Sequence, residues 1–172
     1  MRTYQWTLLL LLALALASSG CLGAAYKAGD EAYARGDMNA ALAEYRAGAA
    51  EGDPGSLFAL GAMSASGQGL PRDDAQAVAY YQQAAELGSV EAMTALGMRY
   101  LDGDGVPKDE AKGTELLMTA AEQGCPLAAA QISYMYHEGI YLPQDDGMAM
   151  YTGWAAEANG MPSPDTEALS AP

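Results

Sequence analysis

The residues of this chain that could take part in chemistry are few and scattered. Asp102 and Asp104, in the segment LDGDG, are spaced like two ligands of a calcium-binding loop. Such a loop needs a third oxygen ligand early and a bidentate acid at its end, and Val106 occupies that third position. We therefore interpret both aspartates as residues of a turn between helices, and we expect no metal site.

Groups of residues that could catalyse a reaction are also missing from the sequence. The chain has one histidine, His137, so a cluster of histidines that binds metal cannot form. Ser66, in SASGQG, lacks the glycine two residues earlier that a nucleophile elbow requires. The sequence therefore predicts no catalytic residue and no cofactor, and we expect His137 to lie on the surface of a helix.

The N-terminal segment has the features of an export signal. Arg2 precedes an uninterrupted apolar run at 8–17, which is about half of the roughly 20 residues that span a bilayer. The small residues SSG and then Cys21 follow, and this arrangement resembles the bacterial lipoprotein signal, in which cleavage precedes a lipid-carrying cysteine. The resemblance implies lipid attachment at Cys21 and an anchor in the bacterial envelope, with the periplasmic face of the outer membrane as the expected location. The alternative is an ordinary secretory signal with an unmodified Cys21.

The charge balance of the chain is strongly acidic. Its 22 Asp and Glu residues outnumber its 8 Lys and Arg residues, and the net charge is −14. Such a chain repels nucleic-acid phosphates and anionic lipid head groups, so we expect no nucleic acid as a partner and membrane contact through the lipid anchor only. If Cys21 carries lipid, Cys125 has no partner for an intramolecular disulfide, and we expect it half-buried near a helix start.

The chain repeats itself with a period of 36 residues. The segment AAELG at 84–88 returns as AAEQG at 120–124. Glycine, proline and aspartate keep the same register, which an alanine-rich composition does not explain. The positions in register include Gly52, Gly88, Gly124 and Gly160; Gly67, Gly103 and Gly139; Pro71, Pro107 and Pro143; and Asp73, Asp109 and Asp145. A period of this size predicts a solenoid of stacked units.

Each unit is expected to be a hairpin of two helices. In the second unit Ser89 caps a first helix, and Leu96 and Tyr100 belong to its apolar stripe. Gly97 also lies in that stripe, and its missing side chain lets a neighbouring helix approach closely. The segment DGDGVP ends the first helix and Asp109 caps a second one. One hairpin cannot bury its apolar faces alone, so the units must stack.

These motifs resemble the Sel-one-like repeat, a relative of the tetratricopeptide repeat with a longer loop between its helices. The shared pattern is Leu-Gly, a Tyr three places later, Gly-x-Gly-hydrophobic-Pro, Asp and a final Ala-Ala-x-x-Gly, over roughly residues 52–160. Ser64 replaces the tyrosine in the first unit, and in the third Ser133 replaces the glycine and Tyr141 the second loop glycine. The resemblance implies an all-α fold, a right-handed α-solenoid of stacked helical hairpins.

The repeat register divides the chain into six segments. They are a signal peptide at 1–20, an N-terminal tetratricopeptide-like hairpin at 21–51, repeats at 52–87, 88–123 and 124–159, and a disordered tail at 160–172. The tail has two prolines where a fourth first helix would begin. Either the tail covers the outer face of the last repeat, or that face is a contact surface.

The resemblance also indicates where a partner would bind. In tetratricopeptide-like solenoids the first helices line the concave face, and aromatic and methionine side chains along a groove suit burial against a protein. The expected partner-binding residues are Tyr26, Tyr33, Phe58, Thr94, Met98, Leu101, Tyr134 and His137, with Asp30, Ala62, Ala65 and Ala130 in the same exposed rows. The alternative is that several of these side chains pack against the neighbouring repeat.

The sequence favours a binding module over an enzyme. The resemblance and the lack of catalytic groups imply an envelope-anchored adaptor that holds a protein or peptide on its concave face. A narrower version is an immunity-type inhibitor of a secreted effector, since some Sel-one-like lipoproteins guard the periplasm and an acidic chain suits a basic toxin. The less favoured alternative is a cell-wall or β-lactam-active enzyme, because related cysteine-rich repeat proteins have been linked to that chemistry. This chain lacks their paired cysteines.

Overall fold

The computed structural model describes residues 24–158. The predicted signal peptide at 1–20, the lipid site at Cys21 and the tail at 160–172 lie outside the described residues. The described part forms eight helices and, within these bounds, no strand. The helices are α2 (Ala24–Ala34), α3 (Met38–Ala50), α4 (Pro54–Ser66), α5 (Asp74–Glu86), α6 (Val90–Asp102), α7 (Glu110–Glu122), α8 (Pro126–Glu138) and α9 (Asp146–Ala158).

Short polar side chains and prolines define where the helices begin. The side chains of Asp53, Ser89 and Asp109 each accept a hydrogen bond from the backbone N–H three residues later. The first backbone N–H groups of a helix have no partner within it, so these caps stabilise each start. Pro54 and Pro126 take the first helical positions of α4 and α8, where no N–H is needed. The predicted helix starts are therefore confirmed.

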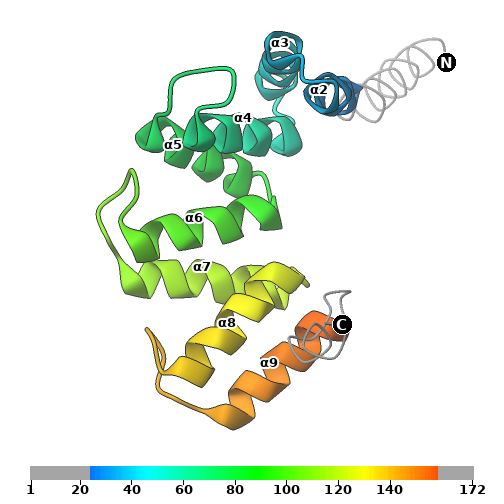
Figure 1. Ribbon diagram of the computed structural model, residues 1–172. Coiled ribbons are helices and arrows are strands. Elements are labelled where there is room, and N and C mark those ends of the chain that lie inside the picture. The colour runs from blue at the N-terminus through cyan, green and yellow to red at the C-terminus, as the bar shows by residue number, and fades with distance from the viewer. Residues whose placement is uncertain (1–23, 159–172) are drawn as a thin grey trace, which may run out of the picture.

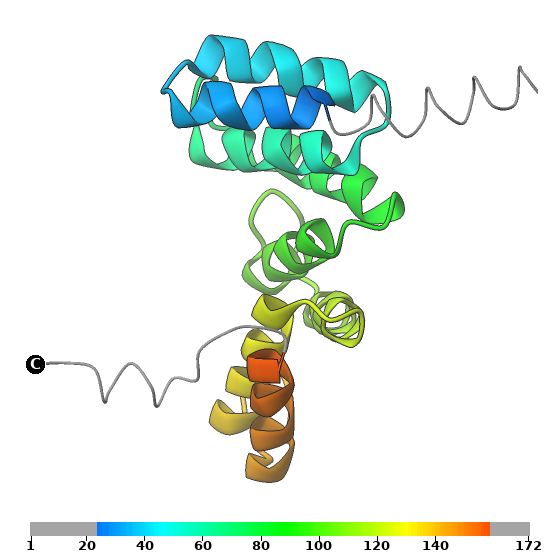
Figure 2. The ribbon, with the colours of Figure 1, turned by 90° about the vertical axis from the view of Figure 1, so that its right-hand side faces the viewer.

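Successive helices pair into four hairpins that stack in chain order (Figure 1). The stack is curved, and α2 and α9 lie toward the same side of it, which we call the open side. Figure 2 views the stack from the open side and shows that the helix direction rotates from the first hairpin to the last. The predicted all-α solenoid of stacked hairpins is confirmed. No helix among residues 24–158 is both long enough and apolar enough to cross a bilayer.

The apolar stripe of each first helix completes the core of the preceding repeat. Leu96 and Tyr100 of α6 are buried in one cluster with Leu57 of α4 and Tyr81 of α5. This contact runs between repeats and removes the stripe from water. Its burial explains why the hairpins stack, because area removed from water is the main favourable term in such packing.

Within a hairpin, a large side chain of one helix lies against a glycine of the other. A Cβ atom at Gly61 would lie 2.5 Å from the ring of Tyr81. At Gly97 it would lie 3.0 Å from the Cγ of Leu117, which takes the Tyr81 position in the next repeat. The close helix approach predicted at Gly97 is confirmed, and the same contact occurs at Gly61.

In the last hairpin the glycine lies on the second helix and the larger side chain on the first. Ser133 stands in register with those glycines, and Gly153 stands where Tyr81 and Leu117 stand in the earlier repeats. The Ser133 hydroxyl donates a hydrogen bond to the Ala149 carbonyl at 2.7 Å. A Cβ at Gly153 would lie 3.1 Å from the Ser133 hydroxyl oxygen. Gly153 therefore makes room for the serine that departs from the repeat pattern.

Candidate functional site

A hollow of about 200 Å³ lies between α2 and α4, beside α3. We call it the α2–α4 hollow. Its lining residues are Tyr26, Asp30, Tyr33, Tyr45, Phe58, Ala59, Ala62, Met63, Ser66 and Gln68. The lining is aromatic and apolar around a single carboxylate, and it contains no lysine or arginine.

Two glycines allow the aromatic rings of the hollow to lie close to the helices. A Cβ at Gly29 of α2 would overlap the ring of Tyr45, and a Cβ at Gly55 of α4 would come within 3.1 Å of the Tyr26 ring. The rings of Tyr26 and Tyr45 are thereby held with centroids 6.1 Å apart and planes tilted by 39°. On the α4 side, the Phe58 ring is supported by Tyr81 at a centroid distance of 5.7 Å. Packing contacts with neighbouring side chains and helices therefore hold the rings in place.

Hydrogen bonds hold the polar groups of the hollow. The Tyr45 hydroxyl donates to Asp30 Oδ1 at 2.6 Å, and the Tyr33 hydroxyl donates to Gln68 Oε1. Burial and the hydrogen bond to Asp30 raise the pKa of Tyr45, and burial and the charge of Asp30 raise the pKa of Tyr26. Both phenols therefore stay neutral at ordinary pH, and Asp30 supplies the only formal charge of the lining.

The structure brings one group of the predicted partner-binding residues together. Tyr26, Tyr33 and Phe58 all line the α2–α4 hollow, with Asp30 and Ala62 from the same predicted rows. They come from α2 and α4, which belong to different hairpins but contact each other directly.

Two further predicted residues are exposed farther along the stack. Met98 of α6 has an exposed fraction of 36%, and Tyr134 of α8 has one of 55%. They lie one repeat apart, and Ala62 of the hollow lies one repeat before Met98. The three residues thus occupy equivalent positions on successive first helices.

The prediction that Thr94 and Leu101 are exposed is wrong. Thr94 is 1% exposed and Leu101 is 7% exposed. The Thr94 hydroxyl donates to the Val90 carbonyl at 2.8 Å and lies 3.3 Å from the sulfur of Cys125, and Leu101 packs in a cluster with Ile132 of α8. Both residues face the next repeat. Cys125 occupies the N-cap position of α8, as expected, but it is buried rather than half-buried.

The predicted position of His137 on a helix surface is confirmed. Its side chain is exposed in the last turn of α8, and Nδ1 lies 3.4 Å from an Asp146 carboxylate oxygen at the start of α9. His137 thus lies at the loop end of the last hairpin. Among the described residues, no group of three or more His, Cys, Asp or Glu side chains is placed to hold a metal ion.

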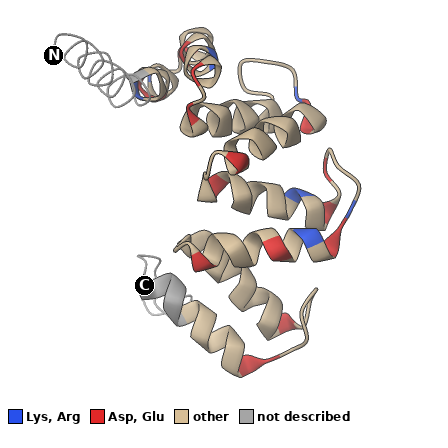
Figure 3. Ribbon diagram, turned by 180° about the vertical axis from the view of Figure 1, so that it is seen from behind, with Lys and Arg blue, Asp and Glu red and all other residues tan. Residues whose placement is uncertain are grey.

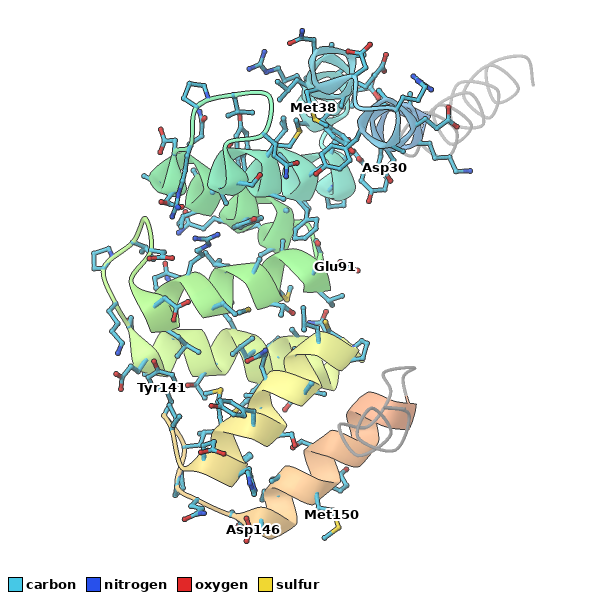
Figure 4. All side chains as sticks on the ribbon, viewed as in Figure 1. Asp30, Met38, Glu91, Tyr141, Asp146 and Met150 are labelled. Atoms are coloured by element: carbon cyan, nitrogen blue, oxygen red, sulfur yellow. The ribbon has the colours of Figure 1, made fainter. Side chains whose placement is uncertain are left out.

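The lysines and arginines of the long repeats lie at the loop ends of the hairpins, where each has a partner (Figure 3). The pairs are Arg72 with Asp74, Arg99 with Asp74 and Asp104, Lys108 with Glu110, and Lys112 with the Tyr100 hydroxyl. Figure 4 shows Asp30 beneath α2 and Glu91 at the start of α6, both toward the open side. The charge of Glu91 contributes to the raised pKa of Tyr26, so this carboxylate acts on the hollow from the next repeat.

Comparison with known families assigns the repeat. Residues 54–89, 90–125 and 126–151 each match the Sel1 repeat. The chain belongs to the Sel1 repeat family. The first helical residues of α4, α6 and α8 begin the three matched units.

Solved structures of Sel1 repeat proteins resemble most of this chain. A protective antigen present in uropathogenic Escherichia coli strains, which displays an SLR fold, is 32% identical with a TM-score of 0.74; the match covers 84% of this chain and 32% of the antigen. A Sel1 repeat protein from Oxalobacter formigenes is 28% identical with a TM-score of 0.74, covering 78% of this chain and 55% of the other. The chain thus spans about a third and about half of their lengths. None of the curated proteins compared with it is a match.

Part of the hollow was not predicted from the sequence. Tyr45, Met63 and Gln68 line it from α3, from the buried side of α4 and from the loop that follows, whereas the prediction used exposed positions of first helices alone. A signal for Tyr45 exists in the sequence. Gly29 and Tyr45 are related across their hairpin as Gly61 and Tyr81 are, with a shorter connection between the helices.

Proposed function

We propose that this Sel1 repeat protein is a protein–protein interaction module whose partner, a protein or peptide, lies along the first helices of the stack. The observation that carries the proposal is the row of equivalent first-helix positions that begins with Ala62 in the hollow. It continues with the exposed side chains of Met98 and Tyr134. A partner along this row would bury aromatic and methionine side chains, which are typical of interface cores.

The chemistry of the described residues supports a scaffold rather than an enzyme. The match of three units to the Sel1 repeat, a repeat of stacked helical hairpins, supports the scaffold. The α2–α4 hollow contains one serine, Ser66, and its hydroxyl donates to the Ala62 carbonyl at 2.8 Å within its own helix. The lining contains neither histidine nor lysine that could activate this serine as a nucleophile.

The proposal includes a location. The apolar run at 8–17 and Cys21 support export and a lipid anchor in a bacterial envelope, with the outer membrane as the proposed site. An immunity-type inhibitor of a basic secreted effector is a narrower version, which the net charge of −14 supports.

Substitution of the exposed row tests the proposed function. Tagged protein, expressed with its own signal, is used to recover the partner from an envelope extract, and the affinity of the recovered partner is then measured. Burial of a large apolar side chain contributes about 1.5–3 kcal/mol, and each 1.4 kcal/mol is about tenfold in affinity. The double variant Met98→Glu/Tyr134→Glu should therefore bind at least about tenfold more weakly.

A matched pair of residues on a second helix provides the control. Met150 and Tyr151 of α9 are 73% and 63% exposed, so Met150→Glu/Tyr151→Glu makes the same chemical change away from the first helices. This variant should bind the partner normally. If the Met98/Tyr134 variant keeps its helical signal, its melting temperature and its affinity for the partner, the proposed surface is wrong.

A further inference from the structure

The α2–α4 hollow carries an inference about the chemistry of the partner, and this inference rests on the proposed function. The hollow combines the aromatic rings of Tyr26, Tyr45 and Phe58 with the carboxylate of Asp30. The Tyr45 hydroxyl occupies Oδ1 of that carboxylate. The Asp30 side chain is exposed to solvent while the hollow is open, so its charge is hydrated in the free protein.

A partner that covers the hollow removes water from this carboxylate. A neutral, apolar side chain would leave the Asp30 charge without compensation, which is costly in a surface that has lost its water. A positively charged side chain compensates it, and its cation is attracted to an aromatic face when it lies within about 6 Å of the ring centroid. The rings and the carboxylate therefore favour the same kind of occupant.

The size of the hollow and its surroundings agree with such an occupant. At about 200 Å³ it is smaller than the roughly 300–1,000 Å³ of pockets that enclose drug-sized molecules. That volume suits one side chain of a larger partner. The lining carries no lysine or arginine that would neutralise Asp30 from within, and the described basic side chains of the long repeats are engaged at the loop ends.

We propose that the α2–α4 hollow binds a lysine or arginine side chain of the protein or peptide partner, with Asp30 as the counter-ion and Tyr26, Tyr45 and Phe58 as the aromatic walls. The occupant enters from the open side, where Glu91 adds negative charge at the start of α6 (Figure 4). The acidic net charge of −14 further favours the approach of a basic partner.

The composition of the chain provides a direct probe. Phe58 is the only phenylalanine of the protein, so labelling with ¹³C-phenylalanine yields NMR signals from the hollow alone. The labelled full chain is titrated at constant ionic strength with N-acetyl-arginine amide, and in parallel with N-acetyl-citrulline amide, a neutral molecule of nearly the same shape. The arginine amide should shift the Phe58 ring signals saturably, and the citrulline amide should bind at least tenfold more weakly.

Two variants separate the specific charge from general acidity. Asp30→Asn removes the charge but retains an oxygen that can accept the Tyr45 hydrogen bond, so the fold is preserved. It should weaken binding of the arginine amide at least tenfold, which corresponds to about 1.4 kcal/mol. Asp102→Asn makes the same substitution at an exposed position near the end of α6 and should change the affinity less than twofold. Tyr26→Leu, which removes one aromatic wall, should also weaken binding.

The inference is overturned if the Phe58 signals do not respond, if citrulline amide binds as well as arginine amide, or if Asp30→Asn binds like the parent protein. These outcomes are distinct from failure of the proposed function, because the probe is a small amide rather than the partner. If partner binding depends on Met98 and Tyr134 but arginine amide does not bind in the hollow, the proposed function is supported and the cation site is refuted. If arginine amide binds in the hollow but the Met98/Tyr134 variant keeps its partner affinity, the cation site is supported and the proposed binding surface is refuted.

Discussion

Replacing Gly61 by alanine tests how closely the two helices of a hairpin must approach. The new Cβ would lie 2.5 Å from Cε1 and 2.7 Å from Cδ1 of Tyr81. Carbon atoms that are not bonded pack best at about 3.5–4.0 Å, so the ring and α4 must separate by about 1 Å. The ring has little room to move, because Tyr81 is 4% exposed and lies against Phe58 at 5.7 Å.

Two opposing effects determine the size of the change in stability. Alanine in the interior of a helix is favoured over glycine by about 1 kcal/mol. Forcing an additional carbon into a packed core costs about 1–3 kcal/mol. We expect the upper part of this range because the Tyr81 ring is buried and lies against Phe58. We therefore expect Gly61→Ala to lower the free energy of unfolding by about 1–2 kcal/mol, or the melting temperature by roughly 2–8 °C for a chain of this size.

The assay is thermal unfolding of the full chain followed by far-ultraviolet circular dichroism. Tyr81→Leu provides the matched background, because leucine occupies the equivalent position at Leu117 and its branched end can shift more easily than a ring. Gly61→Ala should cost less in that background than in the parent protein. If Gly61→Ala is as stable as the parent or more stable, helix propensity outweighs the contact and our account of the hairpin packing is wrong.

Three further predictions concern the anchor, a helix cap and alkaline pH. Cys21→Ser should abolish lipid labelling and release the protein from membranes; unchanged fractionation and mass would contradict the lipoprotein proposal. Asp53→Ala removes a buried cap that accepts the Ser56 N–H at 2.8 Å. Urea titration should show that the free energy of unfolding falls by about 1 kcal/mol, and an unchanged midpoint would argue against the cap. The pKa of Tyr45 is raised above the value near 10 that we expect in the unfolded chain. The unfolded chain thus loses this proton first, so stability should be unaffected below about pH 10 and fall above it. Tyr45→Phe should reduce that fall, and an equal fall in both proteins would refute the assignment.

The architecture could be predicted from local signals because the same capping and turn residues recur in each repeat. Asp53, Ser89 and Asp109 each cap a helix by accepting the backbone N–H three residues later. Pro126 stands at the first position of α8, so its effect is also local. Glycine and proline in a common register therefore identified the hairpins and their stacking. The departure at Ser133 was visible in the sequence, but its compensation by Gly153 required the packing of α8 against α9.

The candidate site depended on tertiary structure. A first helix in a solenoid contacts its own hairpin partner and both neighbouring repeats, so the period of 36 residues groups equivalent positions without saying which of them face a neighbour. Thr94 and Leu101 shared the predicted rows with Met98, yet only the curvature and rotation of the stack decide that the first two are buried and the third is exposed. The α2–α4 hollow is likewise formed by two hairpins and a loop, whose relative placement depends on contacts far apart in the chain. The sequence by itself determined which helices form and in what order they stack, because those choices depend on local capping and periodic burial. Only the tertiary structure decided which side chains remain open to a partner, because exposure depends on how neighbouring repeats cover one another.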